Sequence, residues 1–493
     1  MILTVLILSA PLFPAQEPAG FEALAATVHE RQLANGLRVL VMPRGDAPVA
    51  SFHVHVNAGS IDETTGLTGL AHFAEHMAFK GSRRIGATDW RSERRALDAC
   101  DEAWKAYESA AASGAGPEAL APLRAAFEAA REAADALCDP GAFDRVMETS
   151  GGRNSNASTG ADSTRYFVSL PVERMETWFW LTREMLGDPV MREFYKERDV
   201  VMEERRMRTD SSPFGAALEA LLNTAFVAHP YRDSTIGHMD DLANLDRPEM
   251  IDFWRRHYTA DRMVLAVVGR VEPERGFELA QRYLGGLPAG AAGRPRRALE
   301  PGGPGARQGR VERPANPMLF VAWPVPPLTG RRGQLFDAMG DILAGGPASR
   351  LYQRLVKEEG AAVRVDWIAG YPGRIDPTLF GLMVVPAPGR ELDECLELVQ
   401  QEASRLAAQG PTERELAGVR RRGKMELLRQ LGSSAGLARA LAQSEAEDGG
   451  WRKLFRSLEA LESLGVEDVS RAAGRLWADR CDVVYLVSPS EEE

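Results

Sequence analysis

The stretch Gly66–Ser82 reads GLTGLAHFAEHMAFKGS. Its larger apolar residues recur at helical spacing, which predicts an amphipathic helix with one buried face. These residues are Leu70, Phe73 and Met77. Residues four apart share one face of a helix, so His72 and His76 can offer two imidazoles to a single metal ion.

Glu75 follows His72 by three residues and therefore lies on the same side of the predicted helix. A carboxylate there can hold a metal-bound water without being a ligand. Zinc lowers the pKa of such a water toward about 7, and the carboxylate can then take its proton. Two histidines leave a catalytic zinc short of a third protein ligand, which must come from elsewhere. The alternative is that both histidines are structural, one capping a carbonyl and one exposed.

A second acidic helix offers the missing ligand. The stretch Tyr195–Asp210 reads YKERDVVMEERRMRTD and places Glu197 and Glu204 seven residues apart, two turns along one helix face. Among its other charged residues, Glu203 and Arg205–Arg208 are expected to form a solvated face with i,i+4 pairs. The chain thus contains a carboxylate that could reach the two histidines if the helices pack together.

Alternating apolar runs around these helices predict strands. Arg31–Pro43 contains an Asn-Gly pair before its apolar run, which is a hairpin signal, and Val49–Ser60 is a second alternating run. Thr164–Pro171 has the same texture, and Met263–Gly269 is apolar enough for a buried strand. Strands and helices therefore alternate through the first part of the chain.

The same order of elements recurs later. Met318–Pro324 predicts a strand, and Gln334–Gly346 predicts a helix that ends in glycines, as the first motif helix does. Val483–Val487 closes the chain with a strand, as a buried strand closes the first part. The repeat predicts an α+β fold of two related halves, each a largely antiparallel sheet with helices on one face.

Composition suggests where these halves begin and end. The half that carries the histidines is expected to span residues 25–284, and the second half residues 318–493. Residues 285–317 are rich in Gly, Pro and Arg and predict a linker. Residues 90–138 are rich in Ala, Glu and Arg, with two apolar stripes around a Gly-Ala-Gly-Pro turn, and predict an inserted helical hairpin.

Overall composition is that of a folded globular protein. Of 493 residues, 44% are hydrophobic and 26% are charged, which excludes a disordered chain and a multi-span membrane protein. The 70 acidic and 59 basic residues give a net charge of −11, so we expect no nucleic-acid partner. The four cysteines form no CxxC pair and predict neither a cysteine zinc site nor a disulfide scaffold.

The amino terminus, Met1–Phe13, reads MILTVLILSAPLF. This run is apolar but too short for a stable membrane span, and small and polar residues follow it. Residues 1–18 are therefore predicted to be a signal peptide, which would place the protein in the periplasm or outside the cell. Because no Lys or Arg precedes the apolar run, a hydrophobic tail on a cytoplasmic protein is the alternative.

HFAEH, with GLTGLA before it and MAFKGS after it, resembles the pitrilysin/insulinase-type metallopeptidases, whose motif is the inverted H-x-x-E-H. ERDVVMEE matches the downstream element of that family, in which two glutamates stand seven apart. The resemblance covers nearly the whole chain and is nearest to the shorter bacterial members related to the mitochondrial processing peptidase. It implies that His72, His76 and Glu204 bind Zn²⁺, that Glu75 is the general base, and that Glu197 is a supporting acid.

The stretch Gly151–Thr159, GGRNSNAST, resembles the G-G-x-x-N-A segment of the family. In the family this segment is an edge strand along which the peptide substrate lies, which implies that Asn156 and Ala157 bind substrate. His76 and Glu204 are further apart in this chain than is usual for the family, and the inserted hairpin accounts for the excess.

The second half departs from the pattern of family members that work within one chain. Those members carry an Arg and a Tyr, seven apart, which help to bind substrate and to stabilise the oxyanion. Here the two positions hold Val356 and Val363. We therefore expect a dimer in which a zinc-free homologous subunit supplies the Arg/Tyr pair. The second half also has Asp337, Gly340 and Asp341 in place of the histidine motif and cannot bind zinc in the same way.

Three functions are open at this point. The resemblance favours a zinc-dependent endopeptidase that hydrolyses peptides or unfolded segments through a metal-activated water. A non-catalytic core subunit of a larger complex is the alternative, although such relatives tend to lose the zinc residues, all of which are present here. A zinc hydrolase that acts on another bond rests on the metal chemistry alone.

Overall fold

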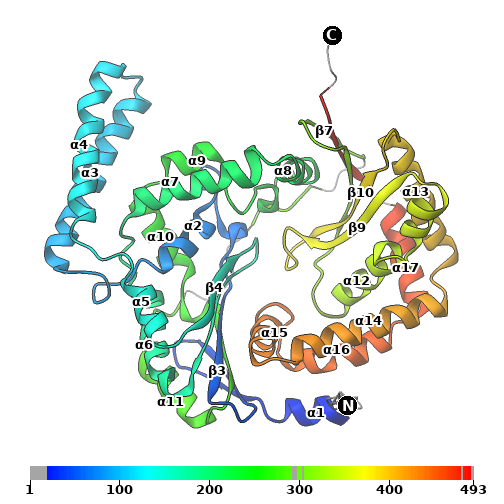
Figure 1. Ribbon diagram of the computed structural model, residues 1–493, viewed down its shortest axis with the longest axis horizontal. Coiled ribbons are helices and arrows are strands. Elements are labelled where there is room, and N and C mark those ends of the chain that lie inside the picture. The colour runs from blue at the N-terminus through cyan, green and yellow to red at the C-terminus, as the bar shows by residue number, and fades with distance from the viewer. Residues whose placement is uncertain (1–18, 291–296, 302–304, 479–480, 490–493) are drawn as a thin grey trace, which may run out of the picture.

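The computed structural model describes residues 19–290, 297–301, 305–478 and 481–489 (Figure 1). The signal peptide predicted for residues 1–18 lies outside the described residues. Within the described ranges, no helix combines the length and the apolar character that crossing a bilayer requires.

Two mixed sheets organise the chain. The first sheet has the order β1-β2-β6-β3-β5-β4 and the second the order β7-β11-β8-β10-β9. The strands of the first sheet are β1 (His29–Gln32), β2 (Arg38–Pro43), β3 (Val49–Val56), β4 (Arg153–Thr159), β5 (Thr164–Pro171) and β6 (Met263–Gly269). The strands of the second sheet are β7 (Gln308–Glu312), β8 (Met318–Val325), β9 (Ala362–Tyr371), β10 (Thr378–Pro386) and β11 (Asp482–Val487).

The two sheets have corresponding pairings, which confirms the prediction of two related, largely antiparallel halves. β2 pairs with β6 in parallel and β7 pairs with β11 in parallel, and the other pairs within each sheet are antiparallel. β7 is therefore the counterpart of β2, although it falls inside the predicted linker at residues 285–317. Its sequence, QGRVE, has no apolar alternation, and the strand that it pairs with, β11, lies at the far end of the chain.

Helices surround both sheets. The first half has α1 (Ala19–Ala25), α2 (Leu70–Ala78), α3 (Trp90–Ala112), α4 (Pro117–Asp135), α5 (Ala142–Thr149), α6 (Met175–Gly187), α7 (Phe194–Arg205), α8 (Pro213–Ala225), α9 (Met239–Asn244), α10 (Arg247–His257) and α11 (Pro273–Leu284). The second half has α12 (Gly330–Ala344), α13 (Leu392–Gln409), α14 (Glu413–Leu431), α15 (Ser434–Glu447), α16 (Arg452–Glu462) and α17 (Val466–Ala478). Shorter turns are η1 (Ser60–Asp62), η2 (Val172–Arg174), η3 (Arg206–Asp210), η4 (Pro230–Arg232), η5 (Ala260–Arg262) and η6 (Tyr352–Glu358).

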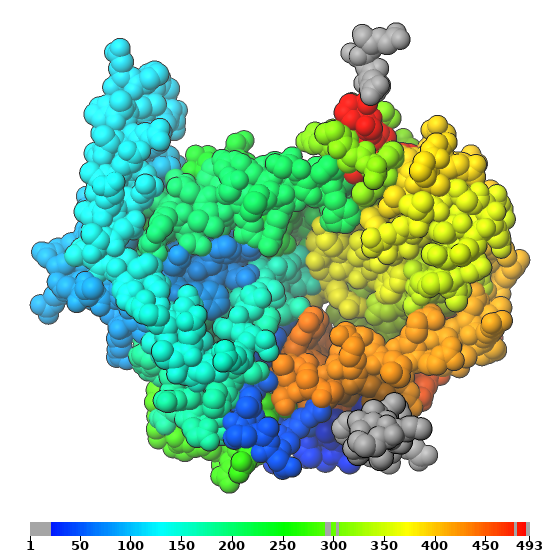
Figure 2. Space-filling view, in the orientation of Figure 1, coloured from blue at the N-terminus to red at the C-terminus, as the bar shows by residue number. Residues whose placement is uncertain are grey.

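The helices α3 and α4 form an antiparallel hairpin that projects from the body of the protein (Figures 1 and 2). Trp104 and Phe127, one from each helix, pack with ring centroids 5.1 Å apart, and Trp104 also contacts Tyr195 of α7. The root of the hairpin is thereby fixed to the helix that carries Glu197 and Glu204. Beyond these rings the hairpin extends into solvent.

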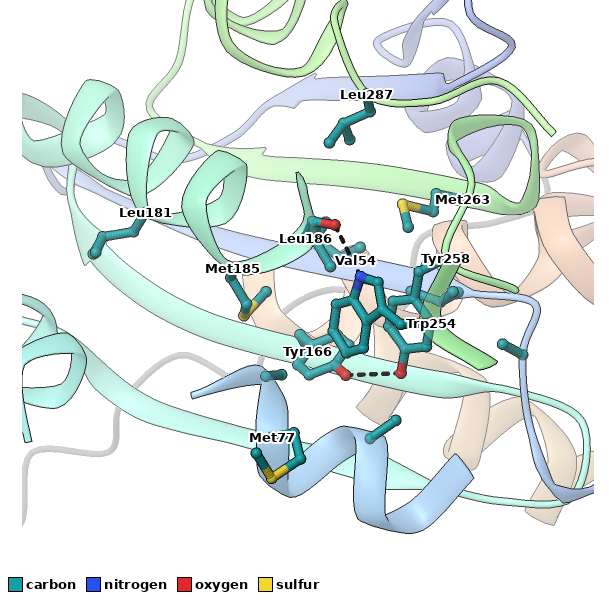
Figure 3. Close-up of a cluster of buried hydrophobic side chains, with 14 of the residues drawn as sticks. Val54, Met77, Tyr166, Leu181, Met185, Leu186, Trp254, Tyr258, Met263 and Leu287 are labelled. Atoms are coloured by element: carbon teal, nitrogen blue, oxygen red, sulfur yellow. Dashed lines mark hydrogen bonds between the residues drawn. The ribbon is translucent and has the colours of Figure 1, made fainter. Parts of the chain in front are cut away.

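A dense core lies beneath α2 (Figure 3). Met77, on the inner face of α2, is fully buried in this core. Nearby, the hydroxyls of Tyr166 and Tyr258 are hydrogen-bonded at 2.9 Å, and the indole N–H of Trp254 donates to the carbonyl of Leu186. Because these buried hydroxyl and indole groups have partners, the inner face of α2 rests on a rigid surface.

The opposite face of each sheet is covered by a helix from the other half. α15 packs on β3 and β6 of the first sheet, where Leu437 and Leu441 join the cluster that contains Leu40. α8 packs on β8 and β11 of the second sheet, where Leu221 joins the cluster that contains Phe320. The prediction of helices on one face was therefore incomplete, because the repeat pattern does not show which helices are exchanged between halves.

Candidate metal centre and substrate-binding edge

The beginning of α2 is fixed by a buried carboxylate. Glu63 accepts hydrogen bonds from the backbone N–H groups of Gly69 and Ala71, at 2.9 and 2.6 Å, and so caps the amino terminus of the helix. Burial raises the pKa of Glu63 to about 8, against the lowering effect of these hydrogen bonds. Gly69 has a φ of +89°, and a Cβ there would lie 2.8 Å from the carbonyl oxygen of Ile236. A glycine is therefore required where the chain enters the helix.

The structure brings together the three side chains that the sequence suggested as metal ligands. Nε2 of His76 lies 3.4 Å from Oε2 of Glu204, and Nε2 of His72 lies 3.7 Å from the same oxygen. One potential ligand atom from each of these residues lies within 4.8 Å of the others. In the described part of the chain, this is the one group of His, Cys, Asp and Glu residues with such an arrangement.

The donor set suits zinc. In a tetrahedral site with Zn–N and Zn–O bonds of about 2.0–2.1 Å, ligand atoms are about 3.4 Å apart. The His76–Glu204 and His72–Glu204 separations, 3.4 and 3.7 Å, are close to this value. Two imidazoles and one carboxylate also leave the fourth position open, as catalytic zinc sites require. The residues present therefore fit the metal that the family resemblance implies.

His76 is oriented by Glu197. Oε1 of Glu197 lies 2.9 Å from Nδ1 of His76, so Nδ1–H donates to the carboxylate and Nε2 keeps its lone pair toward Glu204. The ammonium of Lys80 lies 2.5 Å from the other carboxylate oxygen. Burial opposes both charged forms, but the hydrogen bond and the opposite charges prevail: the pKa of His76 is raised, and that of Glu197 is lowered to about 2.

Glu75 lies beside the cluster without belonging to it. Its Oε2 accepts a hydrogen bond of 2.5 Å from the hydroxyl of Thr159, the last residue of β4. Burial raises the pKa of Glu75, and the negative charge of Glu204 acts in the same direction. His72 is more deeply buried, and burial lowers its pKa to about 3, so this imidazole is neutral and available as a donor. A carboxylate with a raised pKa beside a metal-ligand set is suited to proton transfer.

The charged residues that follow Glu204 are not all solvated, contrary to the prediction. Arg208 is paired with Oε1 of Glu204 at 2.7 Å, which leaves Oε2 toward the histidines. Arg205 is buried and forms ion pairs with Glu219. Arg208 is exposed and lies four residues from Glu204, as the predicted solvated i,i+4 pairs require. The departure is the burial of Arg205, because its partner Glu219 lies on α8, a neighbour that the helix pattern does not show. Glu203 is exposed, as expected.

Strand β4 is an edge of the first sheet and contacts α2. Asn156 and Ala157, the predicted substrate-binding residues, line a cavity of about 450 Å³ together with Glu75, His76 and Glu197. Asn156 is exposed, and its Oδ1 accepts a hydrogen bond from the N–H of Ala157. An open strand edge thus runs along the same cavity as the catalytic candidates.

A β-bulge interrupts this edge. Arg153 pairs with Ser169 and Asn156 with Phe167, so β4 has one extra residue in this interval. Asn154 has a φ of +53°, and Ser155 lines the cavity. The bulge explains why three residues, not two, separate the Gly-Gly and Asn-Ala pairs in GGRNSNA. The match to G-G-x-x-N-A was therefore inexact by one residue. Counting the residues between the two pairs could have revealed the bulge from the sequence.

Among the described residues, the counterpart of α2 in the second half, α12, carries no such cluster. Asp337 pairs with Arg374 at 3.4 Å and Asp341 with Arg422 at 2.7 Å. Arg350, which precedes the expected Arg/Tyr positions, pairs with Glu415 at 2.7 Å. This arginine is therefore held within the second half.

Two models of one peptidase family match the chain: "Insulinase (Peptidase family M16)" over residues 38–99 and "Peptidase M16 inactive domain" over residues 244–422. The "Zinc protease PqqE" of Helicobacter pylori is 30% identical over 338 residues, which cover 67% of this chain and 64% of that protein. Slightly less than two thirds of that relative is therefore matched. The "Mitochondrial-processing peptidase subunit beta" of Lentinula edodes is 25% identical over 90% of this chain and 86% of its own length.

Among solved structures, "a protease from Helicobacter pylori" superposes with a TM-score of 0.77 at 25% identity. The superposition covers 93% of this chain and 99% of that one. The two sheets and their surrounding helices therefore have a solved counterpart over nearly their whole length.

Proposed function

The chain belongs to the insulinase/pitrilysin-like M16 family, and we propose that it is a zinc-dependent endopeptidase acting on peptides or unfolded protein segments. One observation carries the proposal. His72 and His76 of α2 meet Glu204 of α7, more than a hundred residues later, with Glu75 and an open strand edge beside them. This is the donor set, the proton acceptor and the peptide-binding surface that the reaction needs.

Each residue then has a defined task. When bound, zinc supplies Lewis acidity toward the scissile carbonyl and makes an attacking water more acidic. Glu75 takes the proton of that water, and its raised pKa brings it closer to the pH at which proton transfer is efficient. Thr159 holds this carboxylate in place. The peptide backbone pairs with β4 near Asn156 and Ala157, which favours extended and unfolded substrates.

The variant Glu75→Gln tests this assignment. It should keep its zinc while turnover of quenched fluorescent peptides falls by about 10²–10⁴-fold, because the proton acceptor is lost. Glu203→Gln is the matched control, since Glu203 is an exposed glutamate next to Glu204. Zinc content is measured by atomic spectroscopy. Unchanged turnover would exclude Glu75 as the base, and wild-type protein without zinc would contradict the whole proposal.

A partner subunit is part of the proposal. Val363 is exposed, Val356 is packed against the core of the second half, and Arg350 is bound to Glu415, so these residues supply no Arg/Tyr pair near the zinc ligands. We expect a dimer, heteromeric rather than homomeric, in which a zinc-free homologue provides the pair. Light scattering and turnover, measured with and without the product of a neighbouring gene, test this. Full activity as a monomer would contradict it.

The proposed location is the periplasm or the cell exterior. The apolar run Met1–Phe13 supports it, as a signal-peptide core would. Fractionation of cells that express the full chain, followed by sequencing of the mature amino terminus, tests the proposal. Recovery of an uncleaved protein in the cytoplasm would contradict it.

A further inference from the structure

The cavity beside the zinc ligands has a second wall, which comes from a different part of the chain. Phe79 and Lys80 follow α2, whereas Pro140 and Asp144 belong to the loop and to helix α5 after the inserted hairpin. Ser155, displaced by the β-bulge, contributes a hydroxyl. A pocket of about 450 Å³ is large enough for a substrate side chain. This second wall faces any residue that an edge-bound peptide directs toward α2.

The charges on the pocket wall are unequally compensated. Glu197 is paired with His76 and Lys80, and Lys80 also lies 3.5 Å from Glu193. Asp144, by contrast, is exposed and forms no hydrogen bond or ion pair with any described residue. The charges that it senses are those of Glu148 on its own helix and of Lys80, whose ammonium already binds other carboxylates. Asp144 is thus a carboxylate of the pocket wall that has no cationic partner among the described residues.

The remaining surface suits an aliphatic stem. Phe79 is held edge-on by Phe143 and Tyr166, with ring centroids 5.7 and 5.9 Å away, so its ring is fixed. Pro140 adds a rigid apolar surface. A lysine or arginine side chain can lay its methylene groups on such walls and direct its charge to a carboxylate. The aromatic ring adds cation–π attraction, whereas an acidic side chain would be repelled by Asp144.

We propose that Asp144 makes this pocket a subsite for a cationic side chain, so that the peptidase prefers a lysine or arginine next to the scissile bond. The inference rests on the proposed function, because it concerns the same site. An extended peptide on β4 directs alternate side chains to one face, so one residue near the bond enters the pocket. The specificity element is therefore built from the segment that follows the inserted hairpin, outside the H-x-x-E-H helix.

The test uses zinc-loaded full-length protein and peptides that differ at one position, which holds lysine, norleucine or glutamate. Mass spectrometry locates the cut, and kcat/KM is measured for each peptide. Wild-type protein should prefer lysine over norleucine by about tenfold, as expected for one charge-assisted contact. Asp144→Asn should reduce this ratio to about twofold or less. Glu148→Gln, one turn further along α5, should leave it unchanged. An equal preference in wild-type protein, or an unchanged ratio in Asp144→Asn, would overturn the inference.

A binding measurement separates this inference from the proposed function. Glu75→Gln protein, with and without Asp144→Asn, is titrated with fluorescently labelled lysine and norleucine peptides. A lysine preference that depends on Asp144 supports the pocket even if wild-type protein cleaves neither peptide, in which case the proposed function alone fails. Cleavage of both peptides at equal rates, with equal binding, overturns the pocket and leaves the peptidase proposal standing.

Discussion

The two halves share one order over five corresponding strands, and the helices α2 and α12, one from each half, correspond in place but differ in chemistry. α2 presents two histidines and a glutamate, whereas α12 has two aspartates and a glycine at the corresponding places. Each aspartate of α12 is bound by an arginine, Arg374 or Arg422. In the first half, Arg208 pairs with Oε1 of Glu204, which is the carboxylate oxygen that faces away from the histidines. The first half therefore keeps one oxygen of Glu204 and both histidines available for a metal ion, whereas arginines occupy the aspartates of the second half.

The space around the two helices also differs. Gly340 stands where the first half has Glu75, and a Cβ at Gly340 would lie 2.2 Å from Cε3 of Trp367. Trp367 comes from β9, the counterpart of β4. In the first half, β4 provides the small Thr159, which leaves room for a carboxylate. The indole of Trp367 thus fills the volume that the side chain of Glu75 occupies in the first half.

The largest expected effect comes from exchanging a metal ligand. His76→Ala should lose its zinc and at least about 10³-fold of its turnover, because the ion needs three protein ligands. Asp341→Asn, at the corresponding place in α12, should lose neither. Metal analysis and peptide turnover check both variants. Zinc retained by His76→Ala, or lost by Asp341→Asn, would show that the halves do not differ as described.

The next effect concerns the residue that orients His76. Glu197→Gln should weaken zinc binding by about 10–100-fold, because the carboxylate that fixes the imidazole tautomer is replaced by a neutral amide. Competition with a chromogenic chelator measures the affinity. Asp337→Asn, which alters an ion pair of α12, should leave the affinity unchanged. An equal affinity in both variants would remove Glu197 from the description of the site.

A third effect tests the filled volume in the second half. Gly340→Ala should reduce the free energy of unfolding by about 1–3 kcal/mol, because its methyl group overlaps the ring of Trp367. The control is Gly474→Ala in α17, where a Cβ meets nothing within 4 Å. That variant should gain about 0.4–1 kcal/mol from reduced entropy of the unfolded chain. Urea titration measures both, and a neutral Gly340→Ala would mean that the indole can move aside.

The smallest effect concerns the junction of the halves. Hydrogen bonds from His229 and Arg297 lower the pKa of Asp376 to about 2, despite partial burial. The folded value lies below the unfolded value, so the stabilisation is present above about pH 4 and is lost as the pH falls toward 2. After solvent screening we expect roughly 1 kcal/mol. Asp376→Asn should flatten this acid dependence in urea titrations, whereas Asp252→Asn, at an exposed site, should not.

Much of the fold could be predicted because its signals are local or repeated. Helical spacing indicated α2, and the recurrence of strand and helix patterns indicated two related halves. The site residues came together as suggested, although their binding of zinc stays a prediction. The strand β7 was missed because its pairing is set by β11, more than 150 residues away, and not by its own composition.

Other features depend on geometry that a linear pattern does not contain. The bulge in β4 required a count of residues against a partner strand, and Thr159 was not recognised because a hydroxyl carries no motif of its own. Arg205 was assigned to solvent, but it is buried because its partner Glu219 lies on α8, a neighbour that the helix pattern does not show. Asp144 was not identified because a single acidic residue is no motif, and its position on the cavity wall is visible only in the structure.

α8 of the first half packs on the second sheet, and α15 of the second half packs on the first sheet. The predicted linker at residues 285–317 therefore separates the halves in the sequence but not in the folded protein. A chain cut near residues 291–296 would remain associated, since each fragment keeps a helix seated in the groove of the other. Either fragment made alone would leave a row of leucines and valines uncovered and would aggregate. We therefore expect the two fragments to be stable when they are produced together and unstable when either is produced alone.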